Sequence, residues 1–349
     1  MEYPHISGRF PGTLTSGSDP GYAIGVRVTA GHLIGLLLDL DGTAVDLGPA
    51  AATVPALSRK DLRADLQGVG VEAVVDGIAA LTGELLEARR DLDGRVLGLG
   101  VSIGGHVDGE AGIVRFSPDL AWSGEAPLAA LLKAATGFEV VVVENDVNVL
   151  VDAEQWSGTA GRYRRFAVVK VGTGIGCGLS LHRGLERGAT GAAGELGHVP
   201  FERNGRRCIC GNRGCLQTVA SADAIVRAIR EQGEQAVATI DAAADLARSG
   251  DQLARRSFER AGKALGIGLA ILLNLVNLEA VILCGDAALL KYDPYIDATR
   301  ASLHRHAFST TAEDCDLLIE SRTDELEAGG AASMALGRFA DLMGGRLRE

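Results

Sequence analysis

The sequence predicts an α/β protein built from two similar units in series. Apolar strand-like segments alternate with segments of helical periodicity, which is typical of parallel or mixed sheets covered by helices. Glycine accounts for 47 of the 349 residues and aromatic residues for only 4%, a composition that favours tight turns between strands and helices. The length exceeds what one hydrophobic core usually serves, so two lobes are expected.

The first unit is expected to begin near Tyr22. Residues 1–21 are rich in Gly, Pro and Ser and lack apolar periodicity, so they are predicted to form a flexible tail or linker. The apolar segments that follow are joined by a glycine turn and by the Asp41–Gly42 pair, which predicts three strands. Their expected ranges are 22–31, 33–42 and 43–48.

Helices and strands then alternate to the end of this unit. The apolar residues of 71–90 recur at helical spacing, 126–137 forms a shorter helix that Gly137 ends, and 138–145 is an apolar strand. A further strand is expected at 96–102, followed by a glycine-rich turn at 103–112.

The second unit repeats the opening of the first. Residues 165–181 predict two strands around a glycine turn, and the later elements are a long helix at 252–277, strands at 280–285 and 316–321, and a helix from about Gly329. A repeated strand–turn–strand opening indicates a duplicated architecture, in which ligands are expected in a cleft between the lobes. The predicted domains are 22–142 with 329–349, and 143–328.

Charge and hydropathy exclude several function classes. The net charge of −11 disfavours tight binding to nucleic acid or to anionic lipid. No apolar run reaches membrane-spanning length, and the N-terminal residues lack the charged-then-apolar order of a secretory signal. The protein is therefore predicted to be soluble and cytoplasmic, without a membrane partner.

Three of the six cysteines lie close together behind a histidine. His198, Cys208, Cys210 and Cys215 form the pattern H-x9-C-x-C-x4-C, with glycines that let the backbone turn between the thiols. One imidazole and three thiolates make a closed tetrahedral site for structural Zn2+, with no open position for catalysis. The alternative is four unrelated residues on a polar loop. The other cysteines, Cys177, Cys284 and Cys315, are expected to be small core residues.

Asn145 and Asp146 stand where an apolar strand meets a helix. A carboxylate there could accept the proton of a hydroxyl that attacks a phosphoryl group, and Asn145 could hydrogen-bond a neighbouring hydroxyl. Alternatively, Asp146 simply caps the helix. The residues alone leave both interpretations open.

Three motifs together resemble one known family. They are "GTGIGCG" at 172–178, "GATGAAGELGHVPF" at 188–201 and "CICGNRGCLQTVAS" at 208–221. In combination they strongly resemble the ROK family of repressors and sugar kinases, from about Tyr22 to the C-terminus. The resemblance implies an actin-like (hexokinase/Hsp70-type) two-lobe fold with duplicated ribonuclease H-like units and an interlobe cleft. It also implies that the zinc loop supports a sugar pocket, and that the protein is a homodimer or tetramer.

The resemblance further implies roles for individual residues. Asp146 matches the catalytic base of the kinases, and Asn145, Asp146, Glu195 and His198 match sugar contacts. Gln217 stands where the family has Glu, and Asp119 stands where Asn is usual. Gln217 is expected to contact the sugar, but the loss of a charge-assisted hydrogen bond could weaken binding or change the preferred hydroxyl pattern.

The two phosphate-binding segments of the kinases differ in how well they match. The turn with Gly172, Thr173, Gly174 and Gly176 is intact, although such a turn also occurs as a simple strand connection. In the first hairpin the family carries D-x-G-G-T-K, and here Arg27 replaces the Asp, Thr29 and Ala30 the glycines, and His32 the Lys. Side chains where close backbone approach is required, and a missing acidic group, disfavour binding of Mg-ATP.

Two functions are therefore weighed. The first is a sugar-responsive sensor of the transcriptional-regulator branch, with structural Zn2+, that binds a monosaccharide or sugar phosphate without phosphorylating it. That branch carries a helix-turn-helix before the sensor, for which the residues before Tyr22 leave no room, so direct DNA binding is not expected of this chain. The second is an ATP-dependent kinase of hexoses or N-acetylhexosamines with Asp146 as general base.

Overall fold

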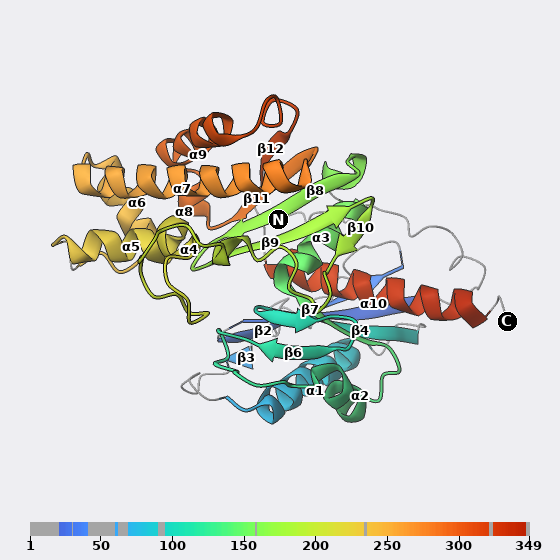
Figure 1. Ribbon diagram of the computed structural model, residues 1–349. Helices are drawn as coiled ribbons and strands as arrows, with labels where there is room; N and C mark the ends of the chain where they lie inside the picture. Colours follow the sequence, from blue (N-terminus) through green and yellow to red (C-terminus); the bar gives the residue numbers. More distant parts are fainter. Residues whose placement is uncertain are drawn as a thin grey trace. The chain divides into compact units, whose positions relative to one another are not determined.

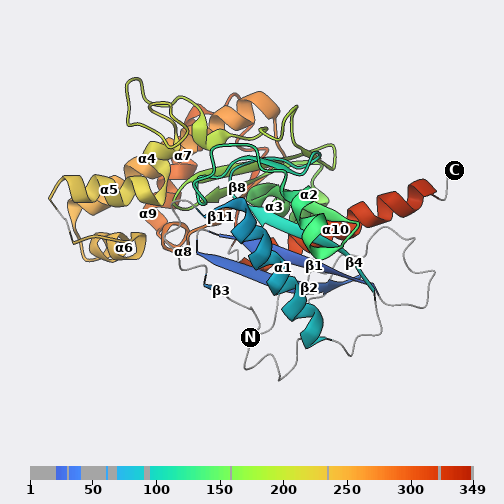
Figure 2. The same cartoon turned by 90° about the horizontal axis from the view of Figure 1, so that it is seen from below.

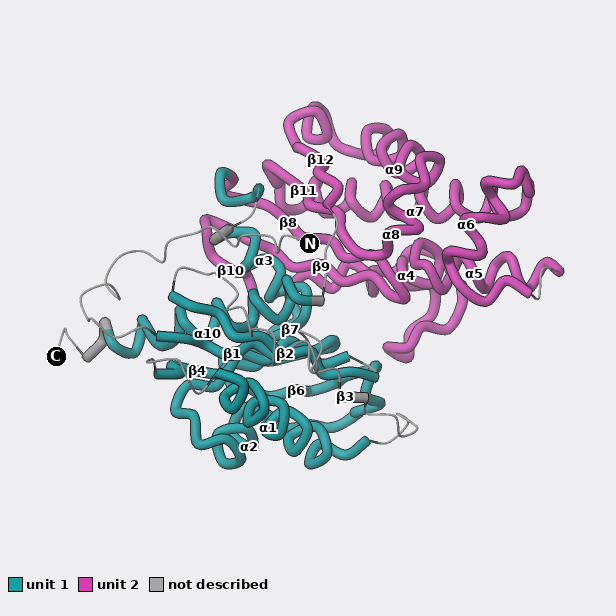
Figure 3. Tube along the Cα trace, turned by 180° about the vertical axis from the view of Figure 1, so that it is seen from behind, with its two compact units in different colours: residues 1–162, 187–193, 323–349 teal, residues 163–186, 194–322 magenta. Residues whose placement is uncertain are grey.

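The computed structural model divides the chain into two compact units (Figure 3). Unit 1 comprises residues 1–162, 187–193 and 323–349, and unit 2 comprises residues 163–186 and 194–322. The residues that the structure describes are 21–29, 31–40, 60–61, 69–89, 95–157, 159–233, 236–320 and 324–346.

Unit 1 contains a mixed five-stranded sheet in the order β3-β2-β1-β4-β7. The strands are β1 (Gly21–Val28), β2 (His32–Asp39), β3 (Lys60–Asp61), β4 (Arg95–Ile103) and β7 (Val141–Asn145). β1 pairs antiparallel with β2 and parallel with β4, and β4 pairs parallel with β7. Nearly every residue of β1 is buried, as expected for a central strand with helices on both faces.

Helices cover both faces of this sheet (Figures 1 and 2). The helices of unit 1 are α1 (Val71–Ala88), α2 (Leu128–Thr136), α3 (Asp146–Ser157), the 3-10 helix η3 (Thr159–Arg162) and α10 (Asp324–Arg346). One core cluster joins Ile24 and Val26 of the sheet to Ile78 of α1 and Leu132 of α2. A second cluster joins Ala23 to alanines of α10, so α10 lies on the opposite face.

Two strand glycines let α10 lie directly on the sheet backbone. A Cβ atom on Gly25 of β1 would lie 1.8 Å from the carbonyl oxygen of Ala328, and one on Gly100 of β4 would lie 1.8 Å from that of Ala331. Real Cβ atoms do not approach backbone so closely, so only glycine fits at both positions.

Unit 2 contains a second mixed sheet, in the order β10-β9-β8-β11-β12. Its strands are β8 (Arg165–Val171), β9 (Ile175–Leu181), β10 (Gly184–Glu186), β11 (Ala280–Gly285) and β12 (Asp316–Ile319). β8 pairs antiparallel with β9 and parallel with β11, which pairs parallel with β12. If the five strands of each sheet are numbered along the chain, both sheets have the same order, 3-2-1-4-5. The shared order indicates a duplicated fold.

A long helix, α7, organises the rest of unit 2. The helices are η4 (Leu196–His198), α4 (Gln217–Ala220), α5 (Ala222–Glu231), α6 (Ile240–Arg248), α7 (Gln252–Val276), α8 (Ala287–Leu290) and α9 (Asp293–His306). The Asp251 side chain caps the start of α7 by accepting a hydrogen bond from the amide of Ala254 at 2.7 Å. α9 packs along α7 (Figure 1), where Gly262 and Gly266 leave room for the α9 backbone.

Most elements predicted from periodicity are confirmed, including α1, β4, α7 and β11. Gly137 ends α2 in the left-handed conformation, at φ 77°. The predicted turn at 103–112 is wrong in part, because residues 106–108 form the strand β5 (His106–Asp108), which pairs with β6 (Ile113–Phe116). The predicted strand at 43–48 and the tail before residue 21 lie outside the described residues.

Unit 1 extends to Arg162, whereas the sequence predicts a domain boundary after residue 142. α3 packs against α10 in unit 1, where a Cβ atom on Gly330 would lie 2.7 Å from the carbonyl oxygen of Val149. α10 also begins at Asp324, earlier than expected. In the part of the chain that the structure describes, no helix is both long and apolar enough to span a bilayer.

The contact between β4 and α10 gives a stability prediction. Gly100→Ala is expected to lower the free energy of unfolding by about 1–3 kcal/mol, because the new methyl group must displace the α10 backbone. Gly83→Ala is the control: Gly83 lies within α1 with no atom near its missing Cβ, so stability should rise by up to about 1 kcal/mol. Urea unfolding measures both, and equal effects would contradict close packing at Gly100.

Candidate functional site

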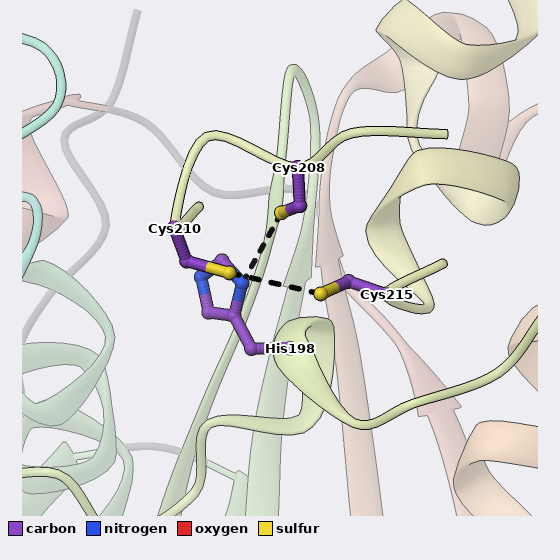
Figure 4. Close-up of side chains that lie close together, drawn as sticks. All are labelled: His198, Cys208, Cys210 and Cys215. Atoms are coloured by element: carbon purple, nitrogen blue, oxygen red, sulfur yellow. Dashed lines mark hydrogen bonds between the residues drawn. The ribbon is translucent and has the colours of Figure 1, made fainter. Parts of the chain in front are cut away.

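The four predicted metal ligands lie together in unit 2 (Figure 4). The ligand atoms of His198, Cys208, Cys210 and Cys215 all lie within 4.8 Å of one another. His198 comes from η4, and the three cysteines come from the loop that leads into α4. Cys208 and Cys215 are buried. The structure thus brings together every ligand predicted from the spacing.

Glycines and backbone hydrogen bonds shape the cysteine loop. The amide of Cys208 donates to the carbonyl of Asn212 at 2.8 Å, and the amide of Gly211 donates to that of Cys208 at 3.0 Å. Gly211 and Gly214 have φ angles of 92° and 72°, in the left-handed region that favours glycine. Two tight turns therefore direct the cysteine side chains toward one point.

The distances between these atoms fit a tetrahedral zinc ion. The sulfur of Cys208 lies 3.5 Å from Nδ1 of His198, and the sulfurs of Cys210 and Cys215 lie 3.7 Å apart. Zn–S bonds of about 2.3 Å and Zn–N bonds of about 2.0 Å in a tetrahedron place neighbouring ligand atoms about 3.5–3.8 Å apart. Three thiols and one imidazole are also the donors that zinc prefers, so these residues fit the ion.

The thiol pKa values in this cluster differ. Burial, together with hydrogen bonds to the thiols of Cys210 and Cys208, raises the pKa of Cys215 to about 12. Burial also raises the pKa of Cys210, but hydrogen bonds from the Asn212 backbone and from the other thiols outweigh it, so the net pKa lies below its usual value. Cys210 therefore ionises more readily than Cys215.

His198 has its second ring nitrogen near a carboxylate. Nε2 of His198 lies 3.8 Å from Oε2 of Glu195, whose side chain is exposed. With Nδ1 facing the sulfurs, Nε2 faces Glu195 at a distance longer than a hydrogen bond.

Gln217 connects the metal ligands to the glycine turn. Its Nε2 donates to the sulfur of Cys208 at 3.2 Å, and its Oε1 accepts from the amide of Ile175 at 3.3 Å. The turn is also held at its start, because the amide of Ala222 donates to the carbonyl of Gly172 at 2.8 Å. A sugar contact of Gln217 stays a prediction.

The glycine turn joins β8 to β9, as predicted. Within it the amide of Gly172 donates to the carbonyl of Gly174 at 2.9 Å, and Thr173 is exposed. A nucleotide-binding role for Gly172, Thr173, Gly174 and Gly176 stays a prediction.

In unit 1, Asn145 ends β7 and Asp146 begins α3, as predicted. Oδ1 of Asn145 accepts from the amides of Val147 at 2.9 Å and Asn148 at 3.2 Å, and its Nδ2 donates to the carbonyl of Gly105 at 2.8 Å. Asn145 is therefore a side-chain cap of α3. Asp146 adds a carboxylate in the first turn, where the helix dipole favours negative charge.

A buried carboxylate beside these residues was not identified from the sequence. Glu144 is only 1% exposed; its Oε1 accepts from the amide of Asn145 at 2.9 Å and from Nδ2 of Asn148 at 3.0 Å. Its Oε2 accepts from Nε of Arg187 at 2.6 Å. The sequence signal was a charged residue at the end of an otherwise apolar strand.

The first hairpin of unit 1 contains a buried ion pair. Nε of Arg27 lies 3.0 Å from Oε2 of Glu327 in α10, and their side chains are 16% and 2% exposed. At the hairpin tip, Oγ1 of Thr29 accepts from the amide of His32 and donates to its carbonyl, both at 3.0 Å. The Thr29 hydroxyl thus binds the His32 backbone, which a glycine at position 29 would leave accessible.

The predicted sugar-site residues are divided between the units: Asn145 and Asp146 belong to unit 1, and Glu195, His198 and Gln217 belong to unit 2. Within unit 2, Glu195 and Gln217 form a local cluster with the predicted metal ligands through the contacts described above.

Curated relatives include both repressors and kinases. The chain is 26% identical to the xylose repressor of Bacillus subtilis (strain 168) over 336 residues, which cover 96% of this chain and 82% of the repressor. It is 36% identical to the glucokinase of Thermotoga maritima over 266 residues, which cover 72% of this chain and 81% of the kinase.

Solved structures show the same two classes. A ROK family transcriptional regulator, a homologue of the E. coli MLC protein, superposes with a TM-score of 0.77 at 25% identity, over 91% of this chain and 78% of that one. A ROK family glucokinase from Streptomyces griseus, in complex with glucose and AMPPNP, superposes with a TM-score of 0.73 at 25% identity, over 91% and 100%.

These likenesses confirm the predicted fold class, an α/β protein with the actin-like, two-lobe fold of the ROK sugar kinases. The model of the ROK family matches residues 44–338, which is most of the chain. The chain therefore belongs to the ROK family.

Proposed function

We propose that the protein is a sugar sensor of the transcriptional-regulator type, which binds a monosaccharide or sugar phosphate and does not transfer phosphate. The observation that carries this proposal is the ion pair of Arg27 with Glu327 in the first hairpin. By resemblance, Arg27 stands where the kinases of the family have an aspartate near the phosphates and Mg2+.

The chemistry of this hairpin disfavours Mg-ATP. Mg2+ is bound by oxygen ligands, and a guanidinium group offers none. The charge of Arg27 is balanced by Glu327, which is buried and held in place by its helix, so the pair is part of the scaffold of unit 1. The amide of His32 also donates its hydrogen bond to Oγ1 of Thr29. This amide is therefore not available to bind a phosphate oxygen.

The relatives support a regulator without excluding a kinase. The match to the B. subtilis xylose repressor extends over 96% of this chain, and the match to the T. maritima glucokinase over 72% at higher identity. A sugar ligand is common to both classes. The choice between a regulator and a kinase therefore depends on the residues of the first hairpin rather than on overall sequence identity.

The metal part of the proposal is a structural Zn2+ held by His198, Cys208, Cys210 and Cys215. When bound, the ion supplies a cross-link among four side chains and stabilises thiolates. The protein residues do the rest: turns at Gly211 and Gly214 bring the thiols together, and η4 presents His198 with Glu195 beside it.

Carboxylates provide sugar recognition in this proposal. Asp146 accepts hydrogen bonds from sugar hydroxyls at the start of α3, where Asn145 and Glu144 fix the backbone. Glu195 offers an exposed carboxylate beside the metal loop. Carboxylates that accept hydrogen bonds from hydroxyls are the usual polar contacts of a small-molecule site.

An ATP-dependent sugar kinase is the second candidate, and two observations favour it. Asp146 lies at a strand–helix junction with its carboxylate in the first helical turn, and the glycine turn between β8 and β9 is intact. In that case Asp146 would accept the proton of the attacking hydroxyl. Asp146→Asn would then abolish turnover.

Titration calorimetry with the zinc-loaded protein tests the function. We expect binding of a member of a panel of xylose, glucose, N-acetylglucosamine and their phosphates, and no heat from Mg-AMPPNP with or without sugar. Asp146→Asn should lower the affinity for the sugar by roughly 10- to 150-fold, because one hydrogen bond to a charged group is lost. Binding of Mg-AMPPNP, or phosphorylation of a sugar that Asp146→Asn abolishes, would instead establish the kinase.

The metal centre predicts the effect of removing one thiol. Cys210→Ser should release zinc and lower the melting temperature, because the site loses one of four ligands. Cys315→Ser is the control, since Cys315 is also a free cysteine of unit 2 but lies outside the cluster. Elemental analysis measures zinc per chain, and an unchanged zinc content in Cys210→Ser would exclude this ligand set.

A further inference from the structure

We propose that Gln217 is a positioning residue that couples the metal centre to the glycine turn at 172–176. One amide group reaches both: Nε2 donates to the sulfur of Cys208 at 3.2 Å, and Oε1 accepts from the amide of Ile175 at 3.3 Å. The inference rests on the zinc site of the proposed function, but not on the choice between sensor and kinase.

The orientation of the Gln217 amide follows from its partners. The backbone N–H of Ile175 can only donate, so it must face Oε1. The NH2 group is then directed at Cys208, whose sulfur accepts hydrogen bonds and does so more strongly as a thiolate. Metal binding would fix the position of the Cys208 sulfur, and with it the acceptor that holds Gln217 in this orientation.

Two glycines make room for Oε1 of Gln217. A Cβ atom on Gly174 would lie 3.1 Å from this oxygen, and one on Gly197 would lie 3.2 Å from it. Gly174 belongs to the turn and Gly197 to η4, next to His198. The same Cβ on Gly197 would lie 2.2 Å from the carbonyl oxygen of Ile175, so η4 lies directly against the end of the turn. The half-buried amide of Gln217 thus fills the space where the cysteine loop, η4 and the glycine turn meet.

A glutamate at position 217 could not perform this role. A carboxylate keeps an acceptor for the amide of Ile175, but it has no N–H for Cys208. Glutamine is the side chain that satisfies a donor on one side and an acceptor on the other.

The consequence is a mechanical link between metal occupancy and the turn. With metal bound, Gln217 is held at Cys208, and the amide of Ile175 keeps its partner. Without metal the sulfur of Cys208 is no longer fixed, and the hydrogen bond from Gln217 no longer holds the turn in place; the bond from Ala222 to Gly172 and the pairing of β9 with β8 remain. The order of residues 172–176 therefore depends on the metal.

Three variants of the full chain separate the two halves of this link. Gln217→Glu removes the donor to Cys208 but keeps an acceptor for Ile175, and Gln217→Ala removes both. Gln252→Glu is the matched control, because Gln252 is exposed in the first turn of α7 and the substitution adds the same charge away from the metal.

The first readout is the metal itself, with Co2+ as the probe. Gln217→Glu and Gln217→Ala should lower Co2+ affinity by about tenfold to a hundredfold, the usual effect of losing a partner that holds a metal ligand. The sulfur-to-cobalt charge-transfer band should also shift in both variants, since a hydrogen bond to the sulfur changes its electron density. Gln252→Glu should match the wild type in affinity and spectrum.

The second readout is amide hydrogen exchange of the turn in the zinc-loaded and metal-free wild type and variants. Zinc should slow exchange in residues 172–176 of the wild type and of Gln252→Glu, and this zinc-dependent protection should be lost in both Gln217 variants. The wild-type comparison remains informative if a variant fails to fold.

Different failures have different meanings. Wild-type affinity and spectrum in both Gln217 variants, or no effect of zinc on the turn, would overturn the role of Gln217 and leave the zinc site intact. A wild-type protein that binds neither Co2+ nor Zn2+ would overturn the zinc site itself.

Discussion

The convergence of His198, Cys208, Cys210 and Cys215 on one point is the constraint on which the arrangement of the cysteine loop depends. The loop from Val199 to Leu216 is polar and partly exposed, with Ile209 62% exposed, so burial of apolar surface holds it only weakly. In the proposed function, a metal cross-link between η4 and the cysteine loop takes the place of that core. Glu195 lies beside His198, and Gln217 lies beside Cys208.

Unit 1 is held by apolar packing and by contacts that only glycine permits. Gly25 and Gly100 place α10 on the sheet, and the same helix supplies Glu327 to Arg27 of β1. The hairpin that binds phosphate in kinases of the family thus carries a buried ion pair in this chain. A buried pair is costly to break, because the remaining charge would lack a partner. The arginine at position 27, where the kinases resembled by this chain have an aspartate, therefore helps to hold unit 1 together.

The sequence was most informative where residues close along the chain determine the structure. The metal ligands lie within eighteen residues, and α1, α7 and β11 follow from local periodicity. The short hairpin at 106–116 and the ion pair of Arg27 with Glu327 were missed. The hairpin segment is rich in glycines and polar residues, so it lacks the apolar alternation that predicts strands. The ion pair joins residues that are far apart in the sequence, so local patterns do not predict it. Likewise, the sequence left open whether Asp146 caps the helix; the side-chain cap seen at α3 comes from Asn145, because the helix begins at Asp146 itself.

X-ray absorption at the zinc K-edge of the purified, zinc-loaded protein tests the central constraint most directly. A closed site of one imidazole and three thiolates predicts three sulfur neighbours at about 2.3 Å and one nitrogen at about 2.0 Å, with no bound water. Fewer than three sulfur neighbours, or a shell dominated by oxygen and nitrogen, would contradict the assignment of Cys208, Cys210 and Cys215. In that case the cysteine loop would need another source of order.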